Sequence, residues 1–131
     1  MIMRKASMAM LLLAGGNALA AGPEVTRALF TYGVVEREPG PAIEFMGPDH
    51  DTVIHFTELA GLNGQHVVHE WLHDGQARFR MEFDVAGDVW RVHSSKAITA
   101  TEQGDWRVRV LDAQGRVLRE SVLKVPRADE L

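Results

Sequence analysis

The stretch that decides the fold is Gln76-Ala-Arg-Phe-Arg-Met-Glu-Phe-Asp-Val85. Apolar and polar side chains alternate strictly along it. Successive side chains of an extended strand point to opposite faces, so this pattern predicts a β-strand with one apolar and one solvated face. Directly upstream, Asp74-Gly75 is typical of a two-residue hairpin turn, because a type I′ turn needs positive φ at both central residues. The first predicted element is therefore an antiparallel hairpin.

Strand-forming segments recur along the rest of the chain, whereas helical periodicity is absent. Turn residues such as Asn63-Gly64, Pro39-Gly40-Pro41 and Asp112 to Gly115 separate these segments. About seven short strands at this spacing are typical of a sandwich or barrel. Because Trp71 lies in the middle of its segment, we expect an immunoglobulin-like antiparallel β-sandwich. The predicted strands besides 76–85 are 26–35, 52–59, 66–73, 89–94, 106–110 and 117–125, with a weaker one over 43–46.

The three tryptophans fall on different predicted strands, and we expect each to be largely buried in one core. His69 shares a strand face with Trp71, which favours a packed, hydrogen-bonded histidine beside the core indole. In the last strand the apolar positions change parity between Leu118 and Leu123, which predicts a β-bulge there. The tryptophans are Trp71, Trp90 and Trp106.

Residues 1–20 differ from the rest of the chain. Arg4 and Lys5 give a basic start, residues 6–16 are small or apolar, and Ala18-Leu-Ala20 has the small-x-small pattern of a cleavage site. These features predict a signal peptide over residues 1–20 that is removed after Ala20. They also predict one domain over residues 21–131, in a periplasmic or secreted protein.

Composition excludes several classes of protein. The formal net charge is −4, which argues against a nucleic-acid partner, because binding phosphates needs a basic stripe. No stretch is long and apolar enough for a transmembrane segment. The chain has no cysteine, so disulfides and thiolate zinc sites are excluded.

Several segments in this order are similar to the bacterial family called domain of unknown function 2914. They are His66-Val-Val-His-Glu-Trp71, Phe79 to Val85, Val89-Trp-Arg-Val-His-Ser-Ser-Lys96, Gly104-Asp-Trp-Arg-Val-Arg-Val110 and Asp112 to Leu118. Phe56-Thr-Glu-Leu59 also fits, so the resemblance extends over roughly Val25 to Val125. Domains of this family occur alone or attached to membrane and envelope proteins. The resemblance implies no activity and no catalytic residue.

The segment His93 to Lys96 is the predicted binding site. If Trp90 and Val92 anchor the preceding strand, two hydroxyls and one cation leave the sheet together. They would then receive a carboxylate or a sugar from an envelope protein or glycan. The alternative is that the serines only close a turn. The residues of this site are His93, Ser94, Ser95 and Lys96.

Six histidines suggest a second hypothesis, a periplasmic copper or zinc protein. Strand positions four residues apart lie about 13 Å apart, so histidines from neighbouring strands would have to converge. The candidates for that site are His66, His69, His73 and His93. No Gly-x-Ser-x-Gly motif is present, and we expect no enzyme and no cofactor. The preferred hypothesis is a non-catalytic envelope binding module.

Overall fold

The computed structural model describes residues 22–127 and 129. The predicted signal peptide lies outside this range. Among the residues described, none forms a helix of the length and apolar character that a bilayer crossing requires. The elements are β2 (Glu24–Thr31), β3 (Val34–Val35), β4 (Glu38–Pro39), β5 (Thr52–Ala60), β6 (His66–His73), β7 (Gln76–Asp84), β8 (Val89–Ala97), the 3₁₀ turn η2 (Ala100–Glu102), β9 (Gly104–Leu111) and β10 (Val117–Val125).

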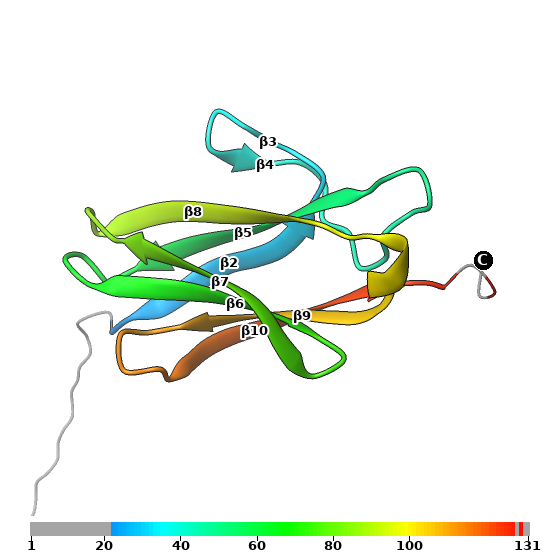
Figure 1. Cartoon of the computed structure of the whole chain (residues 1–131). Coiled ribbons are helices and arrows are strands. Elements are labelled where there is room, and N and C mark those ends of the chain that lie inside the picture. The colour runs from blue at the N-terminus through cyan, green and yellow to red at the C-terminus, as the bar shows by residue number, and fades with distance from the viewer. Residues whose placement is uncertain (1–21, 128, 130–131) are drawn as a thin grey trace, which may run out of the picture.

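Two antiparallel sheets face each other, as Figure 1 shows. One sheet has the order β10-β9-β6-β7 and the other has the order β2-β5-β8. The chain changes sheet after β5, after β7 and after β8, which gives an immunoglobulin-like topology. It differs from the constant-type arrangement because the fourth long strand, β7, pairs with the third instead of the fifth. The predicted all-β sandwich is confirmed.

The predicted turns have the expected backbone. Asp74 and Gly75 have φ of 49° and 86°, so the β6–β7 hairpin closes through two residues with positive φ. Gly115, between β9 and β10, also has positive φ (81°). The bulge predicted in the last strand is present near its start, where the register shifts between Val117 and Arg119. Local sequence therefore sets both hairpins.

The core contains two of the three tryptophans. Trp71 and Trp106 are fully buried in one apolar cluster. Trp90 is half-buried and packs against a second cluster, so the expectation of a single core for all three was wrong. The apolar face of β7 is also less covered than its alternation predicts, with Ala77 exposed and Met81 40% exposed. Both deviations have one cause. β7 and β8 are the outer strands of their sheets, and a three-stranded sheet cannot cover all of a four-stranded one.

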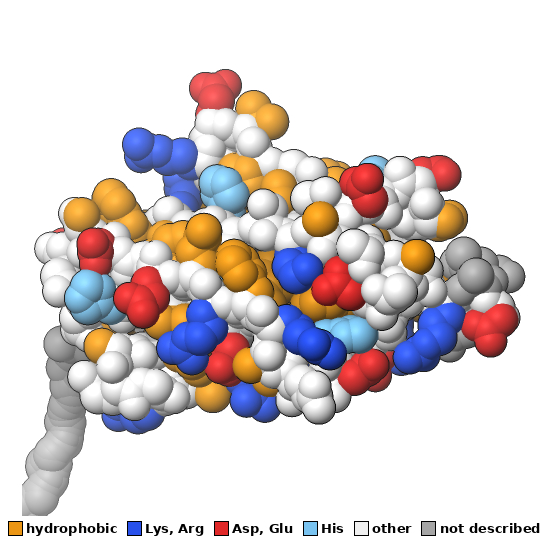
Figure 2. Space-filling model, viewed as in Figure 1, with side chains coloured by type: hydrophobic (Ala, Val, Ile, Leu, Met, Phe, Trp, Pro, Cys, Tyr) orange, Lys and Arg blue, Asp and Glu red, His pale blue; other side chains and the backbone are white. Residues whose placement is uncertain are grey.

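The two sides of the sandwich are closed differently. On the β2/β10 side, residues 43–46 run between the sheets, with the Ile43 amide donating to Phe30 and the Met46 amide donating to Lys124. The Lys124 amide in turn donates to the carbonyl of Glu44. No such segment covers β7 and β8 within the described residues. Figure 2 shows hydrophobic side chains at the surface between these two strands.

Candidate functional site

A chain of hydrogen-bonded side chains crosses the core between the sheets. His55 of β5 lies 3.1 Å from the Ser121 hydroxyl through Nε2 and 3.1 Å from the Thr57 hydroxyl through Nδ1. The same Thr57 oxygen lies 2.8 Å from Nε2 of His69 on β6. Burial, together with a smaller effect of the nearby Arg119 cation, lowers the pKa of His55 to about 3.

The chain continues from His69 to the indole of Trp71. Nδ1 of His69 lies 2.7 Å from the Ser94 hydroxyl, and Nε1 of Trp71 donates to the same oxygen at 2.9 Å. The predicted hydrogen-bonded histidine beside a core tryptophan is confirmed. Burial holds the pKa of His69 well below its usual range, and the neighbouring His55 and His93 act in the same direction.

The lowered pKa values keep both imidazoles neutral, so each ring has one N–H donor and one acceptor nitrogen. Because Trp71 can only donate, Ser94 accepts from its indole. One set of directions satisfies the whole chain. In it Ser94 donates to Nδ1 of His69, His69 donates from Nε2 to Thr57, and Thr57 donates to Nδ1 of His55. This closed set of bonds is structural and offers no open position for a ligand.

The predicted segment His93–Lys96 does not leave the sheet, because β8 continues to Ala97. Ser94 points into the core and is buried. Lys96 points to the same side, where its ammonium lies 5.4 Å from the Trp106 ring and 3.3 Å from Glu102. The four residues thus fall on opposite faces of one strand. Of this segment, His93 and Ser95 are exposed on the outer face.

The outer face of β2-β5-β8 carries a charge network that holds a small hairpin. Arg27 of β2 pairs with Glu38 of β4 at 3.2 Å and with Glu58 of β5 at 2.7 Å. Arg91 of β8 reaches the same two carboxylates at 3.4 Å and 2.9 Å. Hydrogen bonds from Arg27 and Arg91 lower the pKa of Glu58 to about 2. The two cations and two anions balance, and they fix the β3–β4 hairpin over the sheet.

A groove of about 540 Å³ lies between this hairpin and the sheet. Figure 2 shows basic, histidine and hydrophobic side chains next to one another beneath the hairpin. Arg37 has no carboxylate within ion-pair distance among the residues described, and Arg91 is already paired with both glutamates. The groove is lined by Val34, Arg37, Phe56, Val89, Trp90, Arg91 and His93.

The turn that carries Arg37 has an uncommon backbone. Glu36 and Arg37 have φ of 50° and 66°, so both central positions of a type I′ turn are occupied by residues with long side chains. Glycine or asparagine normally fills these positions. Left-handed conformations at such residues cost free energy and occur often at ligand clamps. Here the conformation places a cation at the rim of the groove.

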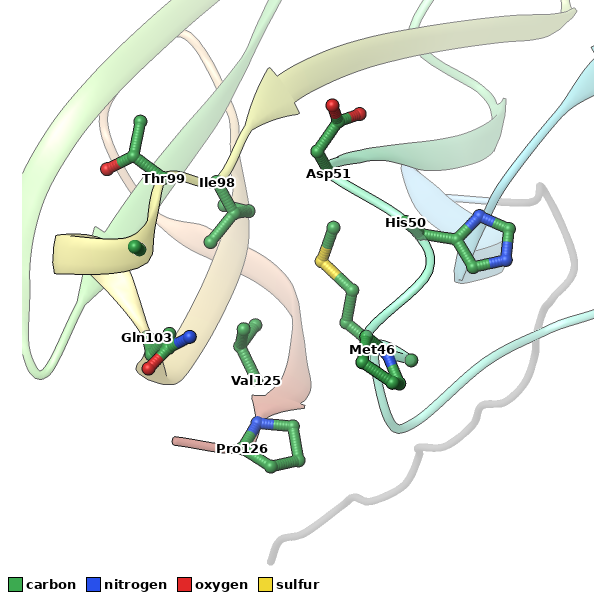
Figure 3. Close-up of a pocket in the computed structure, with 11 residues that line it drawn as sticks. Met46, His50, Asp51, Ile98, Thr99, Gln103, Val125 and Pro126 are labelled. Carbon is green, nitrogen blue, oxygen red and sulfur yellow. The ribbon is translucent and has the colours of Figure 1, made fainter. Parts of the chain in front are cut away.

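A second cavity of about 260 Å³ lies at one end of the sandwich. Figure 3 shows Met46, Ile98 and Val125 pointing toward one another, whereas the His50 ring points away from them. That ring is stacked on Tyr32 at 3.5 Å. The cavity is smaller than a typical ligand site and has no charged group directed into its apolar centre. We therefore regard the groove as the candidate site.

The histidines predicted for a metal site are dispersed. His66 is exposed and pairs with Asp84 at 2.6 Å. His73 stacks on Trp106 and bonds to the carbonyl of Gln103. The other two candidates lie in the core chain and in the groove. Over residues 22–127, no group of three or more potential ligands is placed to hold an ion.

Sequence reasoning found one groove residue, His93, and missed Arg37. The sequence predicts a loop around Arg37, because the prolines of Glu38-Pro39-Gly40-Pro41 exclude a central strand. In the structure Pro39 pairs with Val34 at the edge of a two-stranded hairpin. The unpaired charge of Arg37 depends on contacts between distant segments, and local sequence gives no signal for it.

The fold is an immunoglobulin-like sandwich, and its groove is basic and partly apolar. Residues 64–125 match the family described as protein of unknown function (DUF2914). The resemblance seen in the sequence is thereby confirmed over β6 to β10, a shorter range than Val25 to Val125. No curated protein matches the chain. The matched range contains His93 but not the β3–β4 hairpin.

Proposed function

We propose that this protein is a non-catalytic binding module of the cell envelope. Its groove takes a ligand that carries a carboxylate or similar anion on an apolar body. The proposal rests on one observation, an unpaired arginine beside a histidine at the rim of an apolar groove. The sequence analysis named an envelope protein or a glycan as the partner. Either one would need to present such an acidic group to the groove.

The chemistry of the lining supports an anion with an apolar body. A guanidinium presents several donors in a fixed fork that matches a carboxylate, and its bonds to anions are stronger than neutral ones. Phe56 and Val34 supply apolar contact below it. The volume of about 540 Å³ lies in the range of small-molecule sites. Glu38 and Glu58 are already neutralised by Arg27 and Arg91, so they leave the cation of Arg37 available.

The dye 8-anilinonaphthalene-1-sulfonate, which joins an anion to an aromatic body, tests this proposal. We expect its fluorescence to rise on binding the native protein, and decanoate to displace it. Arg37→Ala should weaken dye binding about tenfold, because one charge-assisted hydrogen bond pair is lost. Titration of dye into each variant measures this difference.

Arg78→Ala is the matched control. Arg78 is exposed and lies on β7, close to the open side where the dye has another apolar surface. The control should bind dye like the unchanged protein. Equal binding by the Arg37→Ala variant, or a loss only with Arg78→Ala, would show that the groove is not the site.

Export is a separate prediction of this proposal. The small residues Ala18 and Ala20 at the cleavage pocket predict a mature protein that begins at Ala21. N-terminal sequencing of the protein recovered from an envelope fraction measures the start. Intact Met1 on protein found in the cytoplasm contradicts the assignment.

A further inference from the structure

The edge of β7 is the least protected strand edge that the structure describes. Residues 43–46 close the β2/β10 side. On β8, Lys96 points inward, and an inward charge is a common device against strand addition. β7 has Phe79, Met81 and Phe83 on its inner face and carries no inward charge. Its only irregularity is the register shift opposite Trp71 and Leu72, at its first residues.

We propose that a second copy of this chain pairs with β7 in antiparallel orientation, with Met81 on the two-fold axis. The sequence around Met81 is self-complementary. Arg80 pairs with Glu70 of its own chain at 3.2 Å. In this register it also lies opposite Glu82 of the other copy, so two further pairs of opposite charge meet across the axis. Cross-strand pairs of opposite charge stabilise a sheet, whereas like charges destabilise it.

The inner face of β7 fits the same register. Phe79 of one copy lies opposite Phe83 of the other, and the two Met81 side chains meet at the axis. Both phenylalanines are only half-buried in the single chain, and Met81 is 40% exposed. Pairing would cover this face with identical apolar side chains. The opposite sheet covers this apolar face only in part, and a second copy would add to that cover.

Neighbouring registers are less favourable. An axis through Arg80 places that arginine opposite its own copy, and an axis through Glu82 places two carboxylates opposite each other. The self-complementary surface is the isologous type that two-fold dimers use. The ladder is short, from Phe79 to Phe83, so the interface is small and we expect a dissociation constant in the micromolar range.

Sedimentation velocity of the purified protein from about 1 to 500 µM tests the pairing. The unchanged protein should shift from monomer to dimer over this range. Arg80→Glu and Glu82→Arg each create two like-charge pairs and should raise the dissociation constant at least about tenfold. Glu24→Arg makes the same charge change as Glu82→Arg at an exposed residue outside β7 and should leave the dimer intact.

Mixing the two variants supplies the decisive comparison. A mixed dimer of Arg80→Glu with Glu82→Arg has opposite charges at both positions, so dimer should return on mixing and also in the doubly substituted chain. Circular dichroism checks that each variant is folded. A monomer at every concentration overturns the proposal. A dimer that tolerates both single reversals, or a mixture that fails to associate, also overturns it.

Discussion

Lowering the pH from 7 to 5 should reduce the free energy of unfolding by about 2 kcal/mol through His55 alone. The pKa of this histidine is about 3 in the folded protein and 6.5 when unperturbed. The unfolded chain therefore binds a proton that the folded chain rejects over this interval. His69 contributes in the same direction, because burial lowers its pKa as well.

The unfolding free energy falls on acidification because both histidines have lowered pKa values in the folded protein. The stabilisation by the neutral imidazoles is fully present above pH 6.5 and is lost as the pH falls toward 3. Carboxylates with lowered pKa values, such as Glu58 and Asp112, stabilise the folded protein at neutral pH. Their contribution to the free energy of unfolding falls only below about pH 4.5, where the unfolded chain begins to bind protons at these groups. The interval from pH 7 to 5 therefore isolates the histidines.

Urea unfolding at pH 7, 6 and 5 measures the effect. Calorimetry in buffers of different ionisation enthalpy should also detect the uptake of up to about two protons on unfolding at pH 5. An unfolding free energy that is constant from pH 7 to 5 would show that the core imidazoles are not held neutral.

Trp71→Ala should cost about 3 to 5 kcal/mol of unfolding free energy and leave most of the chain unfolded if total stability is near its usual lower limit. The side chain is fully buried, packs edge-on against Trp106 and Phe30, and donates to Ser94. Truncation leaves a cavity and removes the donor to the buried Ser94 oxygen. Urea unfolding followed by circular dichroism measures the loss.

Two variants separate packing from hydrogen bonding. Trp71→Phe keeps most of the ring but leaves the Ser94 oxygen without its donor, so it should cost less than Trp71→Ala while still costing about 1 to 3 kcal/mol. Trp90→Ala should also cost less than Trp71→Ala, because Trp90 is only half-buried. Equal losses for Trp90→Ala and Trp71→Ala would contradict the described core.

Much of the fold was predictable because strand formation and hairpin closure depend on adjacent residues. The bounds of β6 and β10 agree with the sequence, and the Asp74-Gly75 turn has the predicted positive φ. Burial was less predictable. Alternation shows which side chains share a face, but the cover over Met81 and Trp90 depends on how far the opposite sheet extends.

The candidate site was harder to foresee for the same reason. The sequence predicted that the strand ends at Ser94, yet its place inside β8 and its partners His69 and Trp71 come from the pairing of distant segments. Arg37 became a candidate only once the hairpin was placed over the sheet. Residue type therefore indicated the kinds of groups available, and topology determined which of them meet.

The short segment over residues 43–46 also determines how the domain would respond to a pulling force. β2 begins at one end of the sandwich and β10 ends at the other, and the two strands run in the same direction (Figure 1). Tension applied through both ends of the domain would slide these strands past each other. The hydrogen bonds that Ile43, Glu44 and Met46 form with Phe30 and Lys124 lie across that direction. They would be loaded together, in shear, and would have to rupture together for the strands to separate.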